Sequence, residues 1–186
     1  MPRIKPDRSA KVHARSLDIA IYPYKEGKLI VEGRLKDERC FRSHLMNGDT
    51  RPPGVLHHMI IRILVSGPDL IIEDIEAEMP ETPREECRET RDSLRPVIGM
   101  SISAGFTNQV KAALGGPASC SHLVALLLAM APAAVQGFWS HIVRKPYDPA
   151  DYSEKALAVV LDTCRVWRSD GPTVRAYREK FRPSSA

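Results

Sequence analysis

Several histidine, cysteine and carboxylate side chains of this 186-residue sequence fall in apolar stretches, where they could carry acid–base or nucleophilic chemistry. His57 is the clearest case, because the alternation of residues 55–65 places it on a strand face that is otherwise apolar. An imidazole held in the core or in a pocket suits proton transfer near neutral pH. A buried histidine that merely satisfies a hydrogen bond is the alternative interpretation.

Cys120 and His122 form the second candidate. They follow a Gly-Gly-Pro break and precede the most apolar stretch of the chain, which predicts a helix capped by Ser119 or Ser121. Backbone amides at such a helix start could stabilise a thiolate or an oxyanion. A cysteine nucleophile also needs a base, which His57 or His122 supplies if the sheet and the helix start meet. A packing role for both residues is the alternative.

Charged residues on two other predicted strands form the third candidate set. Glu32 and Arg34 share one strand face, and Asp74, which has apolar neighbours, falls on the same predicted strand face as Ile72. A carboxylate beneath the helices would have its pKa raised by desolvation or lowered by an arginine, and either shift suits proton transfer. We therefore expect His57 to act as a base and Asp74 to orient it or to act as the acid. Substrate contacts are expected from Arg34, Glu32 and Met59, with a solvated sheet face as the alternative for the first two.

A zinc site would have to gather its ligands from distant parts of the chain. The candidate ligands are Cys87, Cys120, His122, Cys164 and His57. These residue types suit zinc, but only Cys120 and His122 are close in sequence. The sequence therefore predicts no metal ion and no other cofactor, with zinc as the alternative.

Hydrophobic alternation predicts strands in the first half of the chain, and helical spacing predicts helices in the second half. The predicted strands cover residues 11–22, 28–36, 55–65 and 70–77, with a hairpin turn at Glu26-Gly27 and a loop over 40–54. The predicted helices cover residues 83–92, 108–114, 121 to beyond Pro132, 154–167 and a last segment after Gly171. The expected fold class is α+β, an antiparallel β-meander of about four strands packed against C-terminal helices.

The composition, 43% hydrophobic and 27% charged, is typical of one globular domain, here residues 1–186 with flexible ends at 1–10 and 183–186. The net charge is +4, but only 6% of the residues are aromatic, so we expect no nucleic-acid partner. We also expect no signal peptide and no membrane span, since no apolar window reaches about 18 residues. Widely spaced free cysteines then fit a reducing cytoplasm.

Several short motifs, spread over most of the chain, follow one another in a distinctive order. They are Glu32–Asp37 (EGRLKD), His57-His58-Met59, Ile72–Ala77 (IEDIEA), Cys87, Gly105-Phe106, Gly115–Leu123 (GGPASCSHL) and Asp162–Arg165 (DTCR). In this order they resemble the pattern of a bacterial family known as domain of unknown function 2889. The resemblance implies special positions for His57, Asp74, Cys120 and His122, but it implies no reaction.

Two positions depart from the family pattern. His58 stands where the pattern has an aspartate, so a role that rests on that aspartate is not carried over. Arg165 stands where the pattern has a histidine, which weakens a zinc interpretation at Cys164. Proteins of this family resemble accessory members of pathways for aromatic or acyl compounds.

We therefore expect a small cytoplasmic enzyme that uses acid–base catalysis without a redox cofactor. A lyase, or else a hydrolase, that acts on an aromatic or acyl small molecule is the simplest form of this expectation. The many apolar residues also leave room for a homo-oligomer. A non-catalytic binding or assembly protein and a zinc-binding protein are the alternatives, because the common catalytic fingerprints are missing from the sequence.

Overall fold

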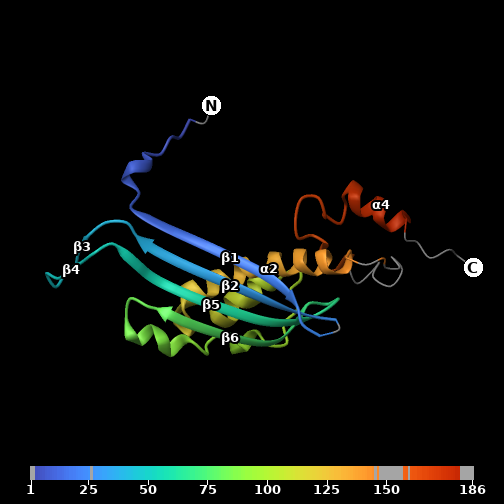
Figure 1. The fold of residues 1–186 in the computed structure, drawn as a ribbon. Helices are drawn as coiled ribbons and strands as arrows, with labels where there is room; N and C mark the ends of the chain where they lie inside the picture. Colours follow the sequence, from blue (N-terminus) through green and yellow to red (C-terminus); the bar gives the residue numbers. More distant parts are fainter. Residues whose placement is uncertain (1–2, 26, 145, 147–156, 159, 181–186) are drawn as a thin grey trace, which may run out of the picture.

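The computed structural model describes residues 3–25, 27–144, 146, 157–158 and 160–180. It confirms the predicted α+β class, with a four-stranded antiparallel sheet followed by helices (Figure 1). The strands of this sheet are β1 (His13–Pro23), β2 (Lys28–Arg39), β5 (Gly54–Ser66) and β6 (Ile71–Glu81). Their spatial order, β1-β2-β5-β6, is that of a meander. A small hairpin of β3 (Ser43–His44) and β4 (Thr50–Arg51) interrupts it between β2 and β5.

Alternation of side chains gives the sheet one buried face and one face that is largely polar. The buried positions of β2 are Leu29, Val31, Gly33, Leu35 and Asp37. On β5, Met59 and Ile61 are fully buried on the same face of the sheet, and His57 shares that face. The prediction that the β5 alternation carries His57 inward is therefore confirmed.

Strand β6 differs from the prediction because it contains a bulge. Val65 of β5 pairs with Ile72, whereas the preceding Leu64 pairs with Asp74, so Glu73 is an extra residue on β6. An extra residue reverses which side chains face the core beyond the bulge. As a result Asp74 is exposed and Ile75 is buried. The expectation that Asp74 shares a face with Ile72 is wrong for this reason.

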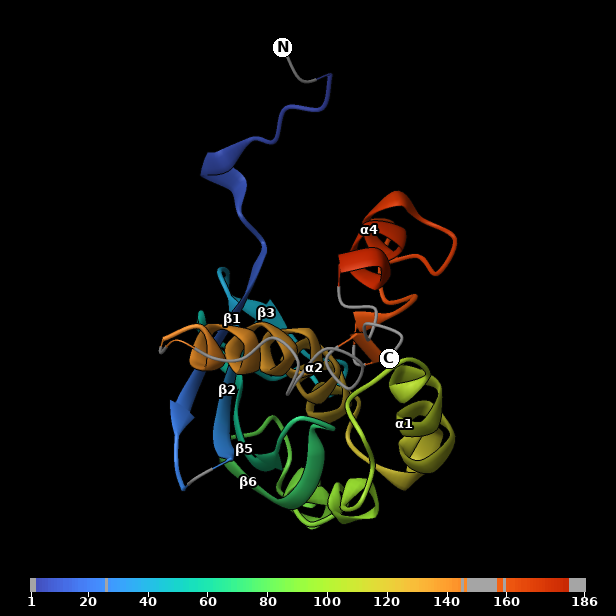
Figure 2. The ribbon, with the colours of Figure 1, turned by 90° about the vertical axis from the view of Figure 1, so that its right-hand side faces the viewer.

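Helix α2 (Ser121–Ile142) covers the buried face of the sheet, as Figure 2 shows in a view turned by 90° from Figure 1. The helix approaches β2 closely at Gly33, where an added Cβ would lie 2.6 Å from Met130 Sδ. It continues past Pro132, as predicted, but its N-cap is Cys120 rather than Ser119 or Ser121.

By length and composition alone, the 22-residue helix α2 could cross a membrane, although the sequence predicted no membrane span. A single such helix is weak support for a membrane span, because the core helix of a soluble protein passes the same test. In this fold, α2 packs its apolar residues on the sheet. These are mainly Leu123, Leu126, Leu127, Met130, Ala134 and Phe138.

The other helical segments agree only partly with their predictions. Helices α1 (Phe106–Leu114) and α4 (Pro172–Lys180) lie where the sequence predicted them. The stretch predicted as a helix over 83–92 forms the 3₁₀ helix η2 (Glu85–Thr90). Three more 3₁₀ turns are η1 (Arg8–Ala10), η3 (Arg95–Val97) and η4 (Gly116–Ala118). Of the helix predicted over 154–167, residues 154–156 and 159 lie outside the described residues, and residues 161–167 are turns and bends.

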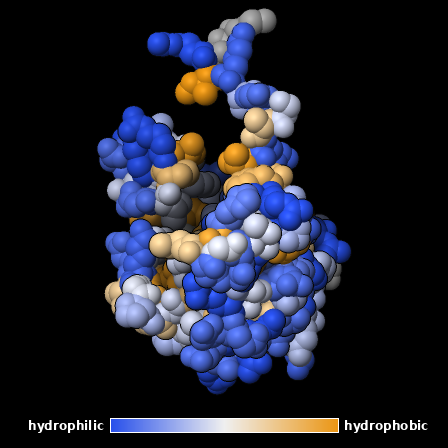
Figure 3. All heavy atoms as spheres, turned by 90° about the vertical axis from the view of Figure 1, so that its left-hand side faces the viewer, coloured by the Kyte–Doolittle hydropathy of each residue, from blue (hydrophilic) through white to orange (hydrophobic). Residues whose placement is uncertain are grey.

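The N-terminal segment, residues 3–12, projects from the end of the sheet at which β1 begins (Figures 1 and 3). Its residues are exposed, and η1 is its one regular element among the described residues. The expected flexible ends fall partly outside the described residues, at 1–2 and 183–186. The single-domain organisation over 1–186 stays a prediction.

Candidate metal centre

Three polar side chains line up across neighbouring strands on the helix-covered face of the sheet. In the strand register, Arg15 of β1 pairs with Asp37 of β2, and Asp37 in turn pairs with His57 of β5. Directly paired side chains on one sheet face stand about 5 Å apart, so the register itself brings these three together. A fourth side chain, His122, reaches the row from the first turn of α2.

Asp37 is the centre of this group. Its side chain is 2% exposed and accepts two hydrogen bonds of 2.7 Å from Arg15, Nε to Oδ1 and Nη2 to Oδ2. The hydrogen bonds from Arg15 hold the pKa of Asp37 below its ordinary value, although burial opposes them. Asp37 is therefore an ionised carboxylate whose orientation is set by the bidentate hydrogen bonds from the Arg15 guanidinium.

Two histidines converge on one oxygen of this carboxylate. His57 Nδ1 lies 3.3 Å and His122 Nε2 lies 3.5 Å from Asp37 Oδ2. The two rings stack with their centroids 3.8 Å apart. Burial lowers the pKa of both imidazoles, and for His122 the neighbouring His57 lowers it further. Neutral imidazoles, the form that binds metal ions, are thus favoured at this site.

The nitrogen that His57 turns toward Asp37 is buried, and although it lies 3.3 Å from Oδ2 of the carboxylate it forms no hydrogen bond of good geometry. Buried polar atoms without partners are rare in folded proteins and call for an explanation. A bound cation is one, since a tetrahedral ion with bonds of about 2.1 Å holds neighbouring ligand atoms about 3.4 Å apart. The ligand atoms of Asp37, His57 and His122 all lie within 4.8 Å of one another.

Two further side chains flank this Asp-His-His triad. Cys120 Sγ lies 3.8 Å from Nδ1 of His122, on the opposite side of the ring from Asp37. His13 of β1 places its Nε2 3.7 Å from Asp37 Oδ1, and its side chain is 46% exposed. Cys120 is therefore placed to fix the His122 ring, whereas His13 lies at the open side of the site.

The structure brings together some of the predicted site residues and separates others. His57, Cys120 and His122 lie at the site, whereas Asp74 is exposed and bonds the backbone N–H of Ile75. Met59 is fully buried in the core.

Glu32 and Arg34 lie on the polar face of the sheet, opposite the triad. Arg34 donates to Glu32 at 2.8 Å, and Arg62 donates to it at 2.6 Å. Arg62 also pairs with Glu76 and Glu78, which completes a network across three strands. Glu32 and Arg34 thus belong to an ion-pair network away from the triad, and a substrate-binding role for them stays a prediction.

The cysteines considered as zinc ligands do not gather. Cys87 packs against the hydrophobic core, and Cys164 lines a cleft of about 580 Å³ between the start of α1 and the middle of α2. Phe106, Pro132 and Trp167 also line this cleft. Within the described residues, neither cysteine belongs to a converging group of metal-ligand type.

Asp37 and Arg15 were not singled out from the sequence, although a signal for Asp37 was present. Asp37 continues the inward alternation of Leu29, Val31, Gly33 and Leu35. Because carboxylates are rarely buried, a carboxylate at the end of such a row indicates a functional or paired group. The position of Arg15 depends on the β1–β2 register, which the loose alternation of β1 does not specify.

A family model matches the chain. The model is described as a protein of unknown function (DUF2889), and it matches residues 13–136, which include all four strands of the sheet and the triad. No curated protein matches the chain, and no solved structure matches it. Because the model covers well over half of the chain, the protein belongs to the DUF2889 family.

Proposed function

We propose that Asp37, His57 and His122 bind one divalent transition-metal ion and that the protein is a metal-dependent hydrolase or lyase. Two imidazoles and a carboxylate suit zinc by ligand type. The observation that carries the proposal is the buried, unpartnered Nδ1 of His57, which faces the same carboxylate oxygen as His122 Nε2.

Three protein ligands leave at least one coordination position for water or substrate, as in catalytic zinc sites. The metal would lower the pKa of a bound water to about 7, so that it could act as a base or a nucleophile. In this arrangement His57 is a ligand rather than the proton-transfer base expected from the sequence. The expected aromatic or acyl substrate stays a prediction.

The residues around the triad support this assignment. Arg15 fixes both carboxylate oxygens of Asp37, and the sulfur of Cys120 lies within reach of the His122 Nδ1–H. Partners of this kind orient metal ligands and select the histidine tautomer that leaves the other nitrogen free.

One observation favours a second candidate, acid–base catalysis without a metal. Arg15 already neutralises the charge of Asp37, which reduces the attraction of the site for a cation. Two stacked imidazoles that are mostly neutral could then pass a proton between them and a bound substrate. A lyase with such a site would need no metal.

Metal analysis of matched variants tests the first candidate. Wild-type protein is purified without chelator, incubated with zinc and dialysed, and we expect about one zinc ion per chain. His57→Ala should lose the bound zinc, whereas His58→Ala, which changes the adjacent side chain on the opposite face, should keep it. Circular dichroism spectra report whether both variants are folded. A wild type that retains only traces of zinc, cobalt or manganese would contradict a metal centre and favour the second candidate.

The enzyme class is tested separately. Hydrolysis of 4-nitrophenyl acetate and 4-nitrophenyl phosphate is measured for zinc-loaded and chelator-stripped protein. Turnover that depends on zinc and is lost in His57→Ala is the expected result. Zinc binding without turnover on these esters, or on a wider panel of lyase substrates, would favour a binding protein instead.

A further inference from the structure

We propose that this metal centre receives an oxyanion group of its substrate, a carboxylate or a phosphate, which is held between the metal ion and the side chains of Arg15 and His13. The inference rests on the proposed function, and it adds the substrate class. It follows from the charges around Asp37, from the donors left over at the open side of the site, and from the basic end of the sheet.

The charges of the triad do not balance a divalent ion. Asp37 is the one carboxylate of the triad, and Arg15 already forms a bidentate ion pair with it. Neutral imidazoles from His57 and His122 contribute no negative charge. A dication there stays largely uncompensated in a partly buried setting, which is costly unless an external anion binds.

The open side of the site carries donors that suit such an anion. Arg15 uses Nε and Nη2 for Asp37, and within the described residues its Nη1 has no partner. The Arg15 side chain is 39% exposed, so Nη1 can reach a ligand. His13, two residues away on the same face of β1, presents its Nε2 close to Asp37. A guanidinium beside an imidazole is a common arrangement for binding carboxylates and phosphates.

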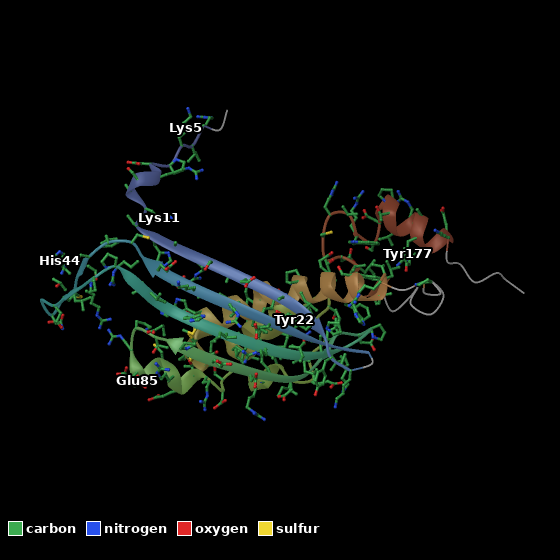
Figure 4. All side chains as sticks on the ribbon, in the orientation of Figure 1. Lys5, Lys11, Tyr22, His44, Glu85 and Tyr177 are labelled. Carbon is green, nitrogen blue, oxygen red and sulfur yellow. The ribbon has the colours of Figure 1, made fainter. Side chains whose placement is uncertain are left out.

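The surrounding end of the molecule is basic. Arg39 pairs with His13 across the strands, and further basic residues lie on the N-terminal segment and on the β3–β4 hairpin. The exposed members of this basic end are Arg3, Lys5, Arg8, Lys11, Arg42 and Arg51. Figure 4 labels Lys5, Lys11 and His44 at this end of the sheet, and Figure 3 shows that this side of the molecule is mostly hydrophilic. The positive electrostatic potential of this basic end attracts anionic ligands toward the metal centre.

The acidic residues of these two segments offset that field only in part, because the segments carry more basic residues than acidic ones. Asp7 is bonded to Ser9, and Asp49 is bonded to Asn47, both at exposed positions along their own segments. Glu38 pairs with Lys36 on the polar face of the sheet. Among the described residues of the row itself, Asp37 is the one carboxylate, and it is already bound to Arg15.

The test uses cobalt(II)-loaded protein, in which the visible absorption spectrum reports ligands that bind the metal. Acetate and methylphosphonate serve as the probes for a carboxylate and a phosphate. We expect at least one of them to change the cobalt spectrum at saturation. His13→Ala should weaken that binding about tenfold, as for loss of one charge-assisted hydrogen bond. His44→Ala, an exposed histidine on the hairpin, should leave it unchanged.

The outcomes separate the two proposals. If cobalt and zinc both fail to bind, the proposed function is overturned, and the oxyanion site falls with it. If the metal binds with the expected stoichiometry but neither probe alters the spectrum, the oxyanion inference alone is overturned. Equal affinity of a probe for His13→Ala and wild type would remove His13 from the site. The relative affinities of the two probes decide between a carboxylate and a phosphate.

Discussion

His57 lies directly opposite Asp37 in the antiparallel pair formed by β2 and β5, and its Nδ1 is 3.3 Å from the Oδ2 of Asp37. This half of the site is built into the sheet, so it forms whenever the two strands pair in register. The other half, His122, depends on how α2 packs against the sheet. The geometry of the site therefore depends on how α2 packs against β2 and β5.

Gly33→Ala should disturb that docking. The new Cβ would lie 2.6 Å from Met130 Sδ and 3.1 Å from Leu126 Cδ1, and both residues follow His122 along one stripe of α2. Overpacking of this kind costs about 1–3 kcal/mol of unfolding free energy and moves the helix, so zinc affinity should also fall. Urea unfolding and zinc titration measure the two effects. Gly54→Ala is the control, because its Cβ meets nothing within 4 Å; equal zinc affinities in the two variants would contradict the prediction.

Asp37→Asn should lower both metal binding and stability. The amide removes the buried charge that Arg15 pairs with, and it can accept fewer of the hydrogen bonds. Because Arg15 is partly exposed and can be hydrated, we expect a loss of about 1–3 kcal/mol of unfolding free energy rather than the larger cost of a fully buried pair. Urea unfolding of metal-free protein measures this loss. Asp18→Asn, on the exposed face of β1, is the control, and a stability equal to wild type in Asp37→Asn would refute the prediction.

The strands could be predicted because β2 alternates clearly and β5 is a long run of mostly apolar residues, and because Gly27 adopts the positive φ that the turn between β1 and β2 requires. Asp74 was misplaced because the extra residue Glu73 reverses the faces of β6 in mid-strand. A bulge of this kind leaves no periodic signal in the sequence, since the residues on both sides of it keep the same composition.

The candidate site was predicted only in part. His57 stood out because it interrupts an apolar strand face, and His122 stood out because it lies beside Cys120 at the start of the most apolar helix. Both signals lie within a single segment of the sequence. The role of Arg15 depends on which β2 residue faces it, and that register is a long-range property. Asp37 was readable from its strand but was considered only as part of a motif. The convergence of these four residues from three strands and a helix depends on the tertiary structure, and no single segment of the sequence indicates it.

Cys120→Ser distinguishes a supporting role for Cys120 from the role of a metal ligand. Cys120 is the N-cap of α2, and its side chain makes no capping hydrogen bond, whereas serine is a preferred N-cap residue. We expect the variant to gain about 0.5–1 kcal/mol of unfolding free energy and to keep its zinc affinity, because a serine oxygen can also accept from His122 Nδ1. The cobalt-loaded wild type should accordingly show no sulfur-to-cobalt charge-transfer band. Such a band, lost in Cys120→Ser, would make Cys120 a ligand.

Glu32→Gln tests the polar face of the sheet through the pH dependence of stability. Hydrogen bonds from Arg34, and then from Arg62, lower the pKa of Glu32 in the folded protein below its ordinary value of about 4.3. A carboxyl group with a lowered folded pKa stabilises the protein above the unfolded pKa, and this contribution disappears as the pH falls through the folded pKa. The variant should therefore be less stable than wild type by about 1 kcal/mol at pH 7, and the difference should shrink steadily below about pH 4.3.

Urea unfolding across this pH range measures the stability of both proteins, with Glu86→Gln, an exposed position on η2, as the control. Because Glu32 lies on the face opposite the triad, zinc affinity should not change in Glu32→Gln, and a loss of zinc there would mean that the two faces of the sheet are coupled.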